Sequence, residues 1–318
     1  MKFNGFIVGI FCMIAGAYFF PEGTDLLPLK TIIDIGIGLI FLFYGLKLSP
    51  SEFKAGILNY RIHLLIHLST FLLFPLLCLA CLPLFPEGIH SNFWIALFFL
   101  GTLPSTVSSS VVMVSLAKGN VPAAIFNASI SGLIGIFATP FWLSLILGKT
   151  GELDFLNVVQ KLVIQIIVPL VIGLLLQRLL GNWAKRYSKQ LGLLDKGTIL
   201  LIVYSSFSES FGSGLFASAS KFQLLKLVIL VVIFFLFVYF LLGYVAQKLN
   251  LKTEDKITAQ FCGTKKSLVH GSVMIKVIFG QSASAGLLLL PIMLYHSMQL
   301  ILISWFAEKY CRREASPK

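Results

Sequence analysis

Two adjacent lysines, Lys265 and Lys266, lie in a run from residue 257 to residue 279 whose other residues are mostly apolar or small. A charge at the centre of a bilayer costs from about 3 to more than about 10 kcal/mol, so such residues normally face the protein interior and have a function. Thr264 and Ser267 add hydroxyl groups to the same segment. We interpret residues 263–267 as a polar interruption within a membrane-spanning helix. The alternative is a short cytoplasmic loop between two shorter apolar segments.

A second polar interruption occurs at the corresponding place in the first half of the chain. Pro104 is followed closely by five hydroxyl-bearing residues: Ser105, Thr106, Ser108, Ser109 and Ser110. Thr106 and Thr264 are 158 residues apart, close to half of the 318-residue chain. Paired interruptions at matching positions of two halves are the best sequence indication of a transporter binding site.

Both interruptions predict broken helices whose ends face the middle of the membrane. Pro104 removes a backbone donor and clashes with the preceding turn, and Gly263 with the polar residues after it has the equivalent role. Hydroxyl groups can satisfy the freed backbone groups. The second half-helices, beginning near Val107 and Lys266, would present N–H groups and about half a positive charge each, which favours a bound anion.

No carboxylate is expected near these positive groups. Of the 13 acidic residues, only Asp34 and Glu209 lie well within expected spans, and both fall towards the outer side. The pattern therefore predicts an anion-binding cavity at the interruptions. The alternative is that a lysine is structural and binds carbonyls at the end of the preceding half-helix.

The composition is that of an all-α polytopic membrane protein with the lipid bilayer as its surroundings. The chain is 57% hydrophobic and 12% charged, whereas soluble domains are about 25% charged. Spans of roughly 20 apolar residues divide the chain into ten: 3–20, 31–47, 62–84, 93–117, 121–147, 156–179, 197–216, 223–247, 256–278 and 284–307.

The lysines and arginines predict the orientation of these spans, because cytoplasmic loops carry an excess of both residues. With a cytoplasmic N-terminus, 17 fall inside, 6 outside, and Lys265 and Lys266 lie within the ninth span. Both termini should therefore be cytoplasmic, with Gly119 inside and Glu87 outside, in a plasma (inner) membrane. The net charge of +12 follows this topology, so no nucleic-acid partner is expected.

Ten spans divide into five and five, and an odd number per half inverts the second half relative to the first. The chain would then be one domain, 1–318, with repeat 1 at about 1–150 and repeat 2 at about 151–318. The interrupted helices are the fourth of each half, spans four and nine, as in the inverted repeats of secondary transporters.

Two further pairs of polar residues could reach these interruptions. Asn127 and Ser131 are i and i+4 on span five, and His296 and Gln299 are i and i+3 on span ten, so each pair shares a helix face. Either pair could contribute to a ligand site or form hydrogen bonds between helices. Both possibilities remain open.

Enzymatic and metal-dependent functions are not expected. Neighbouring serines and lysines could form a nucleophile pair, but no other hydrolase or metalloprotease motif accompanies them. His63 and His67 have a spacing that could hold a metal, although a solvated face at the membrane interface is favoured. The sequence therefore predicts no enzyme activity, no cofactor and no metal site.

Several segments resemble one known family. The similar segments are 43–50 (FYGLKLSP), 101–110 (GTLPSTVSSS), 117–124 (AKGNVPAA), 263–268 (GTKKSL) and 290–300 (LPIMLYHSMQL). They resemble the bile acid:sodium symporter superfamily, and within it the branch of YfeH-like proteins and sodium/bile acid cotransporter 7. The resemblance implies a panel domain of helices 1, 2, 6 and 7 and a core domain of helices 3–5 and 8–10. Helices 4 and 9 would cross, with the substrate cavity between the domains.

The chain departs from the pattern of the sodium-coupled members. Anchored on Gly263 and Ser267, that pattern places glutamate at Phe261, glutamine at Lys265 and asparagine at Lys266. The family's Ser-Asn pair of helix 4 falls at residues 110–111, where valine replaces the asparagine. Sodium needs oxygen ligands, and an ammonium group offers none.

The sequence thus predicts a secondary-active or facilitative transporter of a small organic anion, working by alternating access and not coupled to sodium through the usual family sites. Lys265 is predicted to replace the sodium ion by bridging carbonyls of the first half-helix to hydroxyls of span four. Lys266, about 100° further round the helix, is predicted to face the anion. Proton coupling and facilitated exchange remain open. The alternatives are a sodium symporter with altered ion sites and a non-transporting membrane regulator.

Overall fold

The structure is a computed structural model that describes residues 5–24, 28–47, 59–106, 108–147, 155–212, 220–279 and 284–312. Within these ranges the regular structure is helical, which confirms the predicted all-α fold. The α-helices are α1 (Gly5–Phe19), α2 (Leu29–Lys47), α4 (Tyr60–Leu68), α5 (Phe74–Ala80), α6 (Asn92–Thr102), α7 (Ser108–Leu116), α8 (Val121–Leu147), α9 (Phe155–Leu162), α10 (Val168–Arg186), α11 (Ser188–Gly212), α12 (Lys221–Lys248), α13 (Thr253–Gly263), α14 (Leu268–Phe279) and α15 (Ala285–Arg312).

Short helical turns complete the described elements. Two π-helical stretches, η2 (Ser69–Leu73) and η6 (Val163–Ile167), join α4 to α5 and α9 to α10. Three 3₁₀ turns, η1 (Pro21–Thr24), η3 (Leu82–Leu84) and η4 (Gly88–His90), lie in connections. The predicted repeat boundary near residue 150 lies outside the described residues.

Seven helical segments of the described chain are long and apolar enough to cross a membrane. They are Leu29–Lys47, Tyr60–Leu84, Val121–Ile146, Leu156–Arg186, Ser188–Gly212, Lys221–Lys248 and Ala285–Cys311. Each corresponds to one of the ten predicted spans. The other three predicted spans are not single helices of membrane-crossing length. Span one has a shorter described apolar helix, Val8–Phe19, and spans four and nine are each divided into two short helices.

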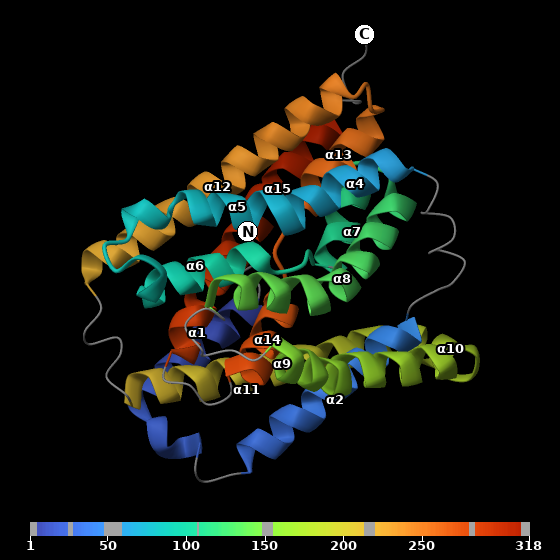
Figure 1. Cartoon of the computed structure of the whole chain (residues 1–318). Coiled ribbons are helices and arrows are strands. Elements are labelled where there is room, and N and C mark those ends of the chain that lie inside the picture. Colours follow the sequence, from blue (N-terminus) through green and yellow to red (C-terminus); the bar gives the residue numbers. More distant parts are fainter. Residues whose placement is uncertain are drawn as a thin grey trace.

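The helices form two layers (Figure 1). At the bottom of the view, α2 packs against α10 and α11, and α1 packs against α11. At the top, α12 lies beside α13 and α15, while α13 contacts α4. Helix α11 also contacts α14 and α15, so it connects the lower layer to the divided helices.

Two glycines bring α2 and α10 into direct backbone contact. A Cβ atom at Gly45 would collide with the Leu170 carbonyl oxygen, and one at Gly173 would collide with the Leu42 carbonyl oxygen. Small residues at such positions allow close approach of membrane helices, where van der Waals packing stabilises association. These glycines therefore fix the distance between the two helices.

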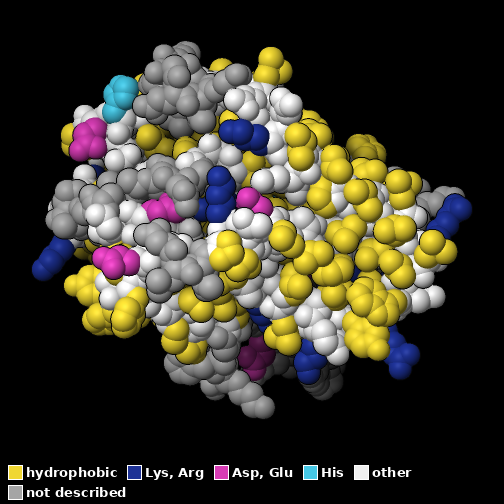
Figure 2. Space-filling model, turned by 90° about the horizontal axis from the view of Figure 1, so that it is seen from below, with side chains coloured by type: hydrophobic (Ala, Val, Ile, Leu, Met, Phe, Trp, Pro, Cys, Tyr) yellow, Lys and Arg dark blue, Asp and Glu magenta, His cyan; other side chains and the backbone are white. Residues whose placement is uncertain are grey.

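The outer surface is apolar over large areas. Seen from below, hydrophobic side chains cover much of the visible face, with lysines and arginines scattered between and around them (Figure 2). Helix α10 contributes eight large side chains to this exposed apolar surface: Val168, Val171, Ile172, Leu174, Leu175, Leu179, Leu180 and Trp183. An apolar outer surface of this extent is expected for an integral membrane protein, whose outside faces lipid.

Candidate functional site

The two polar interruptions meet in space. Helix α6 ends at Thr102 and α7 begins at Ser108, while α13 ends at Gly263 and α14 begins at Leu268, which confirms both predicted breaks. We call the non-helical residues 103–106 and 264–267 the crossover. The backbone N–H of Ser267 donates a hydrogen bond to the Pro104 carbonyl (2.8 Å), and the Ser105 hydroxyl donates one to the Cys262 carbonyl (2.7 Å).

Side-chain donors satisfy the carbonyls that the break in the second helix releases. The Ser69 hydroxyl binds the Gly263 carbonyl at 3.0 Å, and the Thr264 hydroxyl binds the Gln260 carbonyl at 2.6 Å. The Tyr295 hydroxyl donates to the Thr264 carbonyl at 2.5 Å. Within a bilayer no water is available for these groups, so each needs an internal partner. The broken end of α13 is thus fixed by its own C-cap residue, Thr264, and by two neighbouring elements, η2 and α15.

Lys266 satisfies the equivalent carbonyls of the first interruption. Its fully buried ammonium group donates to three backbone carbonyls: Thr70 at 2.8 Å, Gly101 at 2.7 Å and Leu103 at 2.9 Å. It also lies 4.2 Å from the centroid of the Phe74 ring, a favourable cation–π distance. An ammonium has three donors, and all three are used. The positive charge is therefore held at the C-terminal end of α6, where the helix dipole favours it.

Pro75 explains why the Thr70 carbonyl is free to bind this lysine. In the π-helical register of η2, the donor to Thr70 would be the N–H of residue 75, which proline lacks. The neighbouring Phe71 carbonyl accepts instead from the Trp142 indole at 2.7 Å. A local backbone irregularity in span three thus provides one of the oxygen ligands of Lys266.

The predicted roles of the two lysines are wrong in one respect: Lys266, and not Lys265, binds the backbone carbonyls. Lys266 does not face an anion, because its three donors bind backbone carbonyls. Lys265, predicted to bridge carbonyls to hydroxyls, contacts the Ser109 hydroxyl at 3.4 Å. The error has a physical reason: residues 264–267 are not helical, so the angle of 100° per residue does not apply to them.

A hydroxyl cluster lies at the start of α7, and one of its members, Ser109, contacts Lys265. The Thr106 hydroxyl lies 2.8 Å from that of Ser109 and 2.9 Å from that of Ser110. Thr106 is buried, whereas Ser109 is partly exposed. The side chain of Ser108 lies outside the described part of the structure. This arrangement offers an ammonium group, hydroxyl donors and a helix N-terminus to an anionic group.

The two candidates on span ten reach the crossover. The Gln299 side chain accepts from the Lys266 backbone N–H and donates to the Lys266 carbonyl, both at 2.9 Å. Its amide nitrogen also lies 3.0 Å from Nδ1 of His296. Gln299 therefore holds the backbone of Lys266 on both sides. His296 is thereby linked to the crossover through Gln299.

The two candidates on span five have different partners. The Ser131 hydroxyl accepts from the Ser105 backbone N–H at 2.9 Å, so Ser131 does close on the crossover. The fully buried Asn127 instead contacts Nδ1 of His63 at 2.8 Å and donates to the Ala123 carbonyl at 2.7 Å. The expected solvated position of His63 is therefore wrong, because this side chain is buried in a helix contact.

The last polar candidate, Ser267, begins the second half-helix. Its hydroxyl accepts from the His270 backbone N–H at 3.2 Å and lies 3.0 Å from Nδ1 of the same histidine. Ser267 is thus an N-cap of α14. Sequence reasoning missed four residues that bind freed carbonyls or Lys266: Ser69, Thr70, Phe74 and Tyr295. The Ser69-Thr70 pair within an apolar run was the one available signal.

Comparison with known proteins identifies the class to which this architecture belongs. Residues 4–312 match the SBF-like CPA transporter family, so the chain belongs to that family. The protein PA2026 of Pseudomonas aeruginosa is 38% identical over 98% of this chain and 93% of its own length. YfeH of Escherichia coli, named as a candidate symporter, is 33% identical over 97% of this chain and 93% of its own length. Sodium/bile acid cotransporter 7 of Rattus norvegicus is 31% identical over 93% of this chain and 89% of its own length.

The crossover does not fit a sodium ion at the positions that the family resemblance implies. Lys265 and Lys266 stand where amide oxygens would be needed, and the ammonium of Lys266 already binds three carbonyl oxygens. At the glutamate position, Phe261 is fully buried and packs against the rings of Tyr239 and Tyr310. The residues present therefore exclude a sodium ion from these oxygens.

Proposed function

We propose that the protein carries a small organic anion across the membrane by alternating access, as a secondary-active or facilitative transporter. The supporting observation is the position of Lys265, whose ammonium lies 3.4 Å from the Ser109 hydroxyl at the N-terminal end of α7. Neither crossover lysine forms an ion pair with a carboxylate of the described residues. The charge of Lys265 therefore has no carboxylate partner among the described residues. Its side chain is fully buried, so the partly exposed Ser109 hydroxyl beside it is the group that an incoming anion would contact first. The name of one similar protein, sodium/bile acid cotransporter 7, agrees with this substrate class.

The proposed architecture has ten membrane-spanning helices in two inverted repeats of five. In this arrangement α6 with α7 is the fourth helix and α13 with α14 the ninth. Their carbonyls and hydroxyls are bound to each other at the crossover, as expected of paired broken helices. We assign α1, α2, α9–α10 and α11 to the panel domain and the other helices to the core domain. Both termini are assigned to the cytoplasmic side of a plasma (inner) membrane.

Transport is proposed to be independent of sodium because Lys266 takes the place of the ion. A tethered ammonium bound to three carbonyls supplies the positive charge that these oxygens would otherwise require from solution. The charge is permanently attached, so its binding does not vary with the sodium gradient. Proton-coupled transport and facilitated exchange both agree with this arrangement.

The substrate contact is tested by Ser109→Ala, with Ser115→Ala as the matched control on the exposed face of the same helix. Loss of a charge-assisted hydrogen bond should weaken anion binding by about 1–3 kcal/mol, while the control should bind normally. Affinities are measured by thermal shift of purified protein over a series of organic anions and cations. Preferential binding of cations, or equal affinities of the two variants, would contradict the proposal.

The coupling is tested by uptake into proteoliposomes in sodium and in choline buffers over a range of pH. The rate of anion uptake should be the same in both buffers. Lys265→Gln should impair uptake without introducing sodium dependence, because Phe261 still occupies the glutamate position. A steep dependence on sodium in the unmodified protein would refute this part of the proposal.

A further inference from the structure

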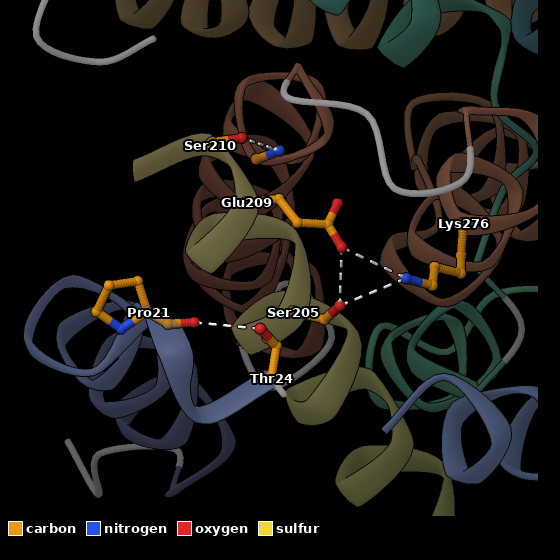
Figure 3. Close-up of polar contacts among 7 residues, drawn as sticks. Pro21, Thr24, Ser205, Glu209, Ser210 and Lys276 are labelled. Carbon is orange, nitrogen blue, oxygen red and sulfur yellow. Dashed lines mark hydrogen bonds and ion pairs between the residues drawn. The ribbon is translucent and has the colours of Figure 1, made fainter. Parts of the chain in front are cut away.

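A third buried lysine lies between α14 and α11, away from the crossover. Lys276 is on α14, and its ammonium lies 3.8 Å from Oε1 of Glu209 on α11. The Ser205 hydroxyl lies 3.4 Å from the ammonium and 3.3 Å from the carboxylate. Figure 3 shows the glutamate extending from α11 towards the lysine, with Ser205 one turn earlier on the same helix. We call these three residues the α11–α14 triad.

The triad is loosely bonded compared with Lys266. A distance of 3.8 Å is too long for a hydrogen bond, and 3.4 Å exceeds the usual range of about 2.7–3.2 Å. Lys266, in contrast, has three partners within 2.9 Å. A buried ion pair with such contacts is weak evidence for a role in stability. The donors of Lys276 are therefore available to a better-placed acceptor.

Two acceptors on the same face of α11 have no partner among the described residues. They are Oε2 of Glu209 and the hydroxyl of Ser208. Ser208 is buried to 3% exposure, and residues 205, 208 and 209 share one helix face by their spacing. Unpaired polar atoms in a membrane interior are costly. The face thus has hydrogen-bonding capacity that the described residues do not use.

The triad is less completely covered than Lys266. The Glu209 side chain retains 17% of its exposure and that of Lys276 5%, while Lys266 is fully covered. Lys276 is eight residues after Leu268, the first residue of α14, which is about 12 Å along that helix. The triad is therefore separate from the crossover, and it lies between α11 and α14, which pack against each other.

We propose that the α11–α14 triad is a second anion-binding site, in which Glu209 is an internal counter-ion that an incoming carboxylate displaces from Lys276. The ligand carboxylate accepts from the lysine and from Ser205. The displaced Glu209 and Ser208 accept hydrogen bonds from donor groups on the same ligand. The cargo class is an amphipathic carboxylate that also carries hydroxyl or amide donors. This inference rests on the proposed transport of an organic anion and assigns that cargo a second contact.

The site is tested by binding of octanoate to the purified full-length protein, measured by thermal shift below the micellar concentration. Octanamide and octylammonium, the neutral and cationic analogues, are the ligand controls. Glu209→Gln removes the competing carboxylate and should tighten octanoate binding about tenfold. Lys276→Gln should abolish octanoate binding, whereas Lys161→Gln, on the exposed face of α9, should leave it unchanged.

The double variant Glu209→Gln with Lys276→Gln leaves no unpaired buried charge, so it tests the loss of binding if Lys276→Gln alone does not fold. The inference is overturned if the wild type does not bind octanoate. It is also overturned if the wild type, Glu209→Gln and the double variant all bind octanoate with the same affinity. The same is true if octylammonium binds more tightly than octanoate. If uptake that depends on Ser109 persists in that case, the proposed function stands and only the second site is rejected. If octanoate binding follows the expected order but no anion is taken up, the second site is supported and the proposed function fails.

Discussion

Replacing Lys266 by methionine should destabilise the protein far more than the same change at Lys265. Methionine fills the volume of the lysine stem without strain, because its side chain is also long and unbranched. Lys266→Met removes three hydrogen bonds of 2.7–2.9 Å to buried carbonyls. Lys265→Met removes one contact of 3.4 Å to a hydroxyl that is partly exposed.

The expected magnitudes follow from these contacts. Each buried carbonyl left without a donor costs about 1–3 kcal/mol, and the relief of burying a charge offsets part of that sum. We expect Lys266→Met to lower the free energy of unfolding by about 3 kcal/mol. For Lys265→Met the expected loss is below about 1 kcal/mol, because its single contact is longer than an ordinary hydrogen bond.

The chain contains its own reporters for this measurement. Cys78 and Cys262 are fully buried, so their thiols react with a fluorogenic maleimide when the protein unfolds. The three more accessible cysteines are replaced by serine in all proteins compared. Thermal unfolding midpoints are then measured for the two variants and the parent in the same detergent. Equal midpoints for the two variants, or a lower midpoint for Lys265→Met, would show that the carbonyl contacts of Lys266 do not hold the crossover together.

Two further predictions concern the packing and orientation of the helices. Gly173→Ala should destabilise the protein by about 1–3 kcal/mol, because the added Cβ would collide with the Leu42 carbonyl oxygen. The control, Gly192→Ala, places its Cβ where no atom lies within 4 Å, so it should be neutral or slightly stabilising. The two variants are compared by their thermal unfolding midpoints. In whole cells whose accessible native cysteines are serine, an impermeant maleimide should label Glu87→Cys and spare Lys248→Cys. The opposite labelling would reverse the proposed topology.

The helix breaks could be predicted from the sequence because their causes are local. Pro104 and Gly263 weaken a helix wherever they lie in its interior, and the hydroxyls that follow each of them indicate where freed backbone groups find partners. The pairing of the two interruptions at about half the chain length also depends on sequence position alone. These signals need no knowledge of the neighbouring helices.

The roles of the two lysines could not be predicted in the same way. Which lysine meets the carbonyls depends on the direction of a non-helical backbone, and on a π-helical stretch in another span that presents the Thr70 carbonyl. The contact between Asn127 and His63 likewise depends on how α8 packs against α4. Such partners are set by tertiary packing, which spacing along one helix does not contain.

The bonds of Gln299 to both backbone groups of Lys266 have a mechanical consequence. The side-chain amide of Gln299 binds both the N–H and the carbonyl of Lys266, so it pairs with this backbone as a neighbouring β-strand would. The centre of the crossover is therefore bonded to α15. Tyr295, one turn earlier on α15, holds the carbonyl of Thr264 as well. A shift of α15 along its axis would therefore carry residues 264–266 with it. We therefore expect residues 264–266 and α15 to move as one unit.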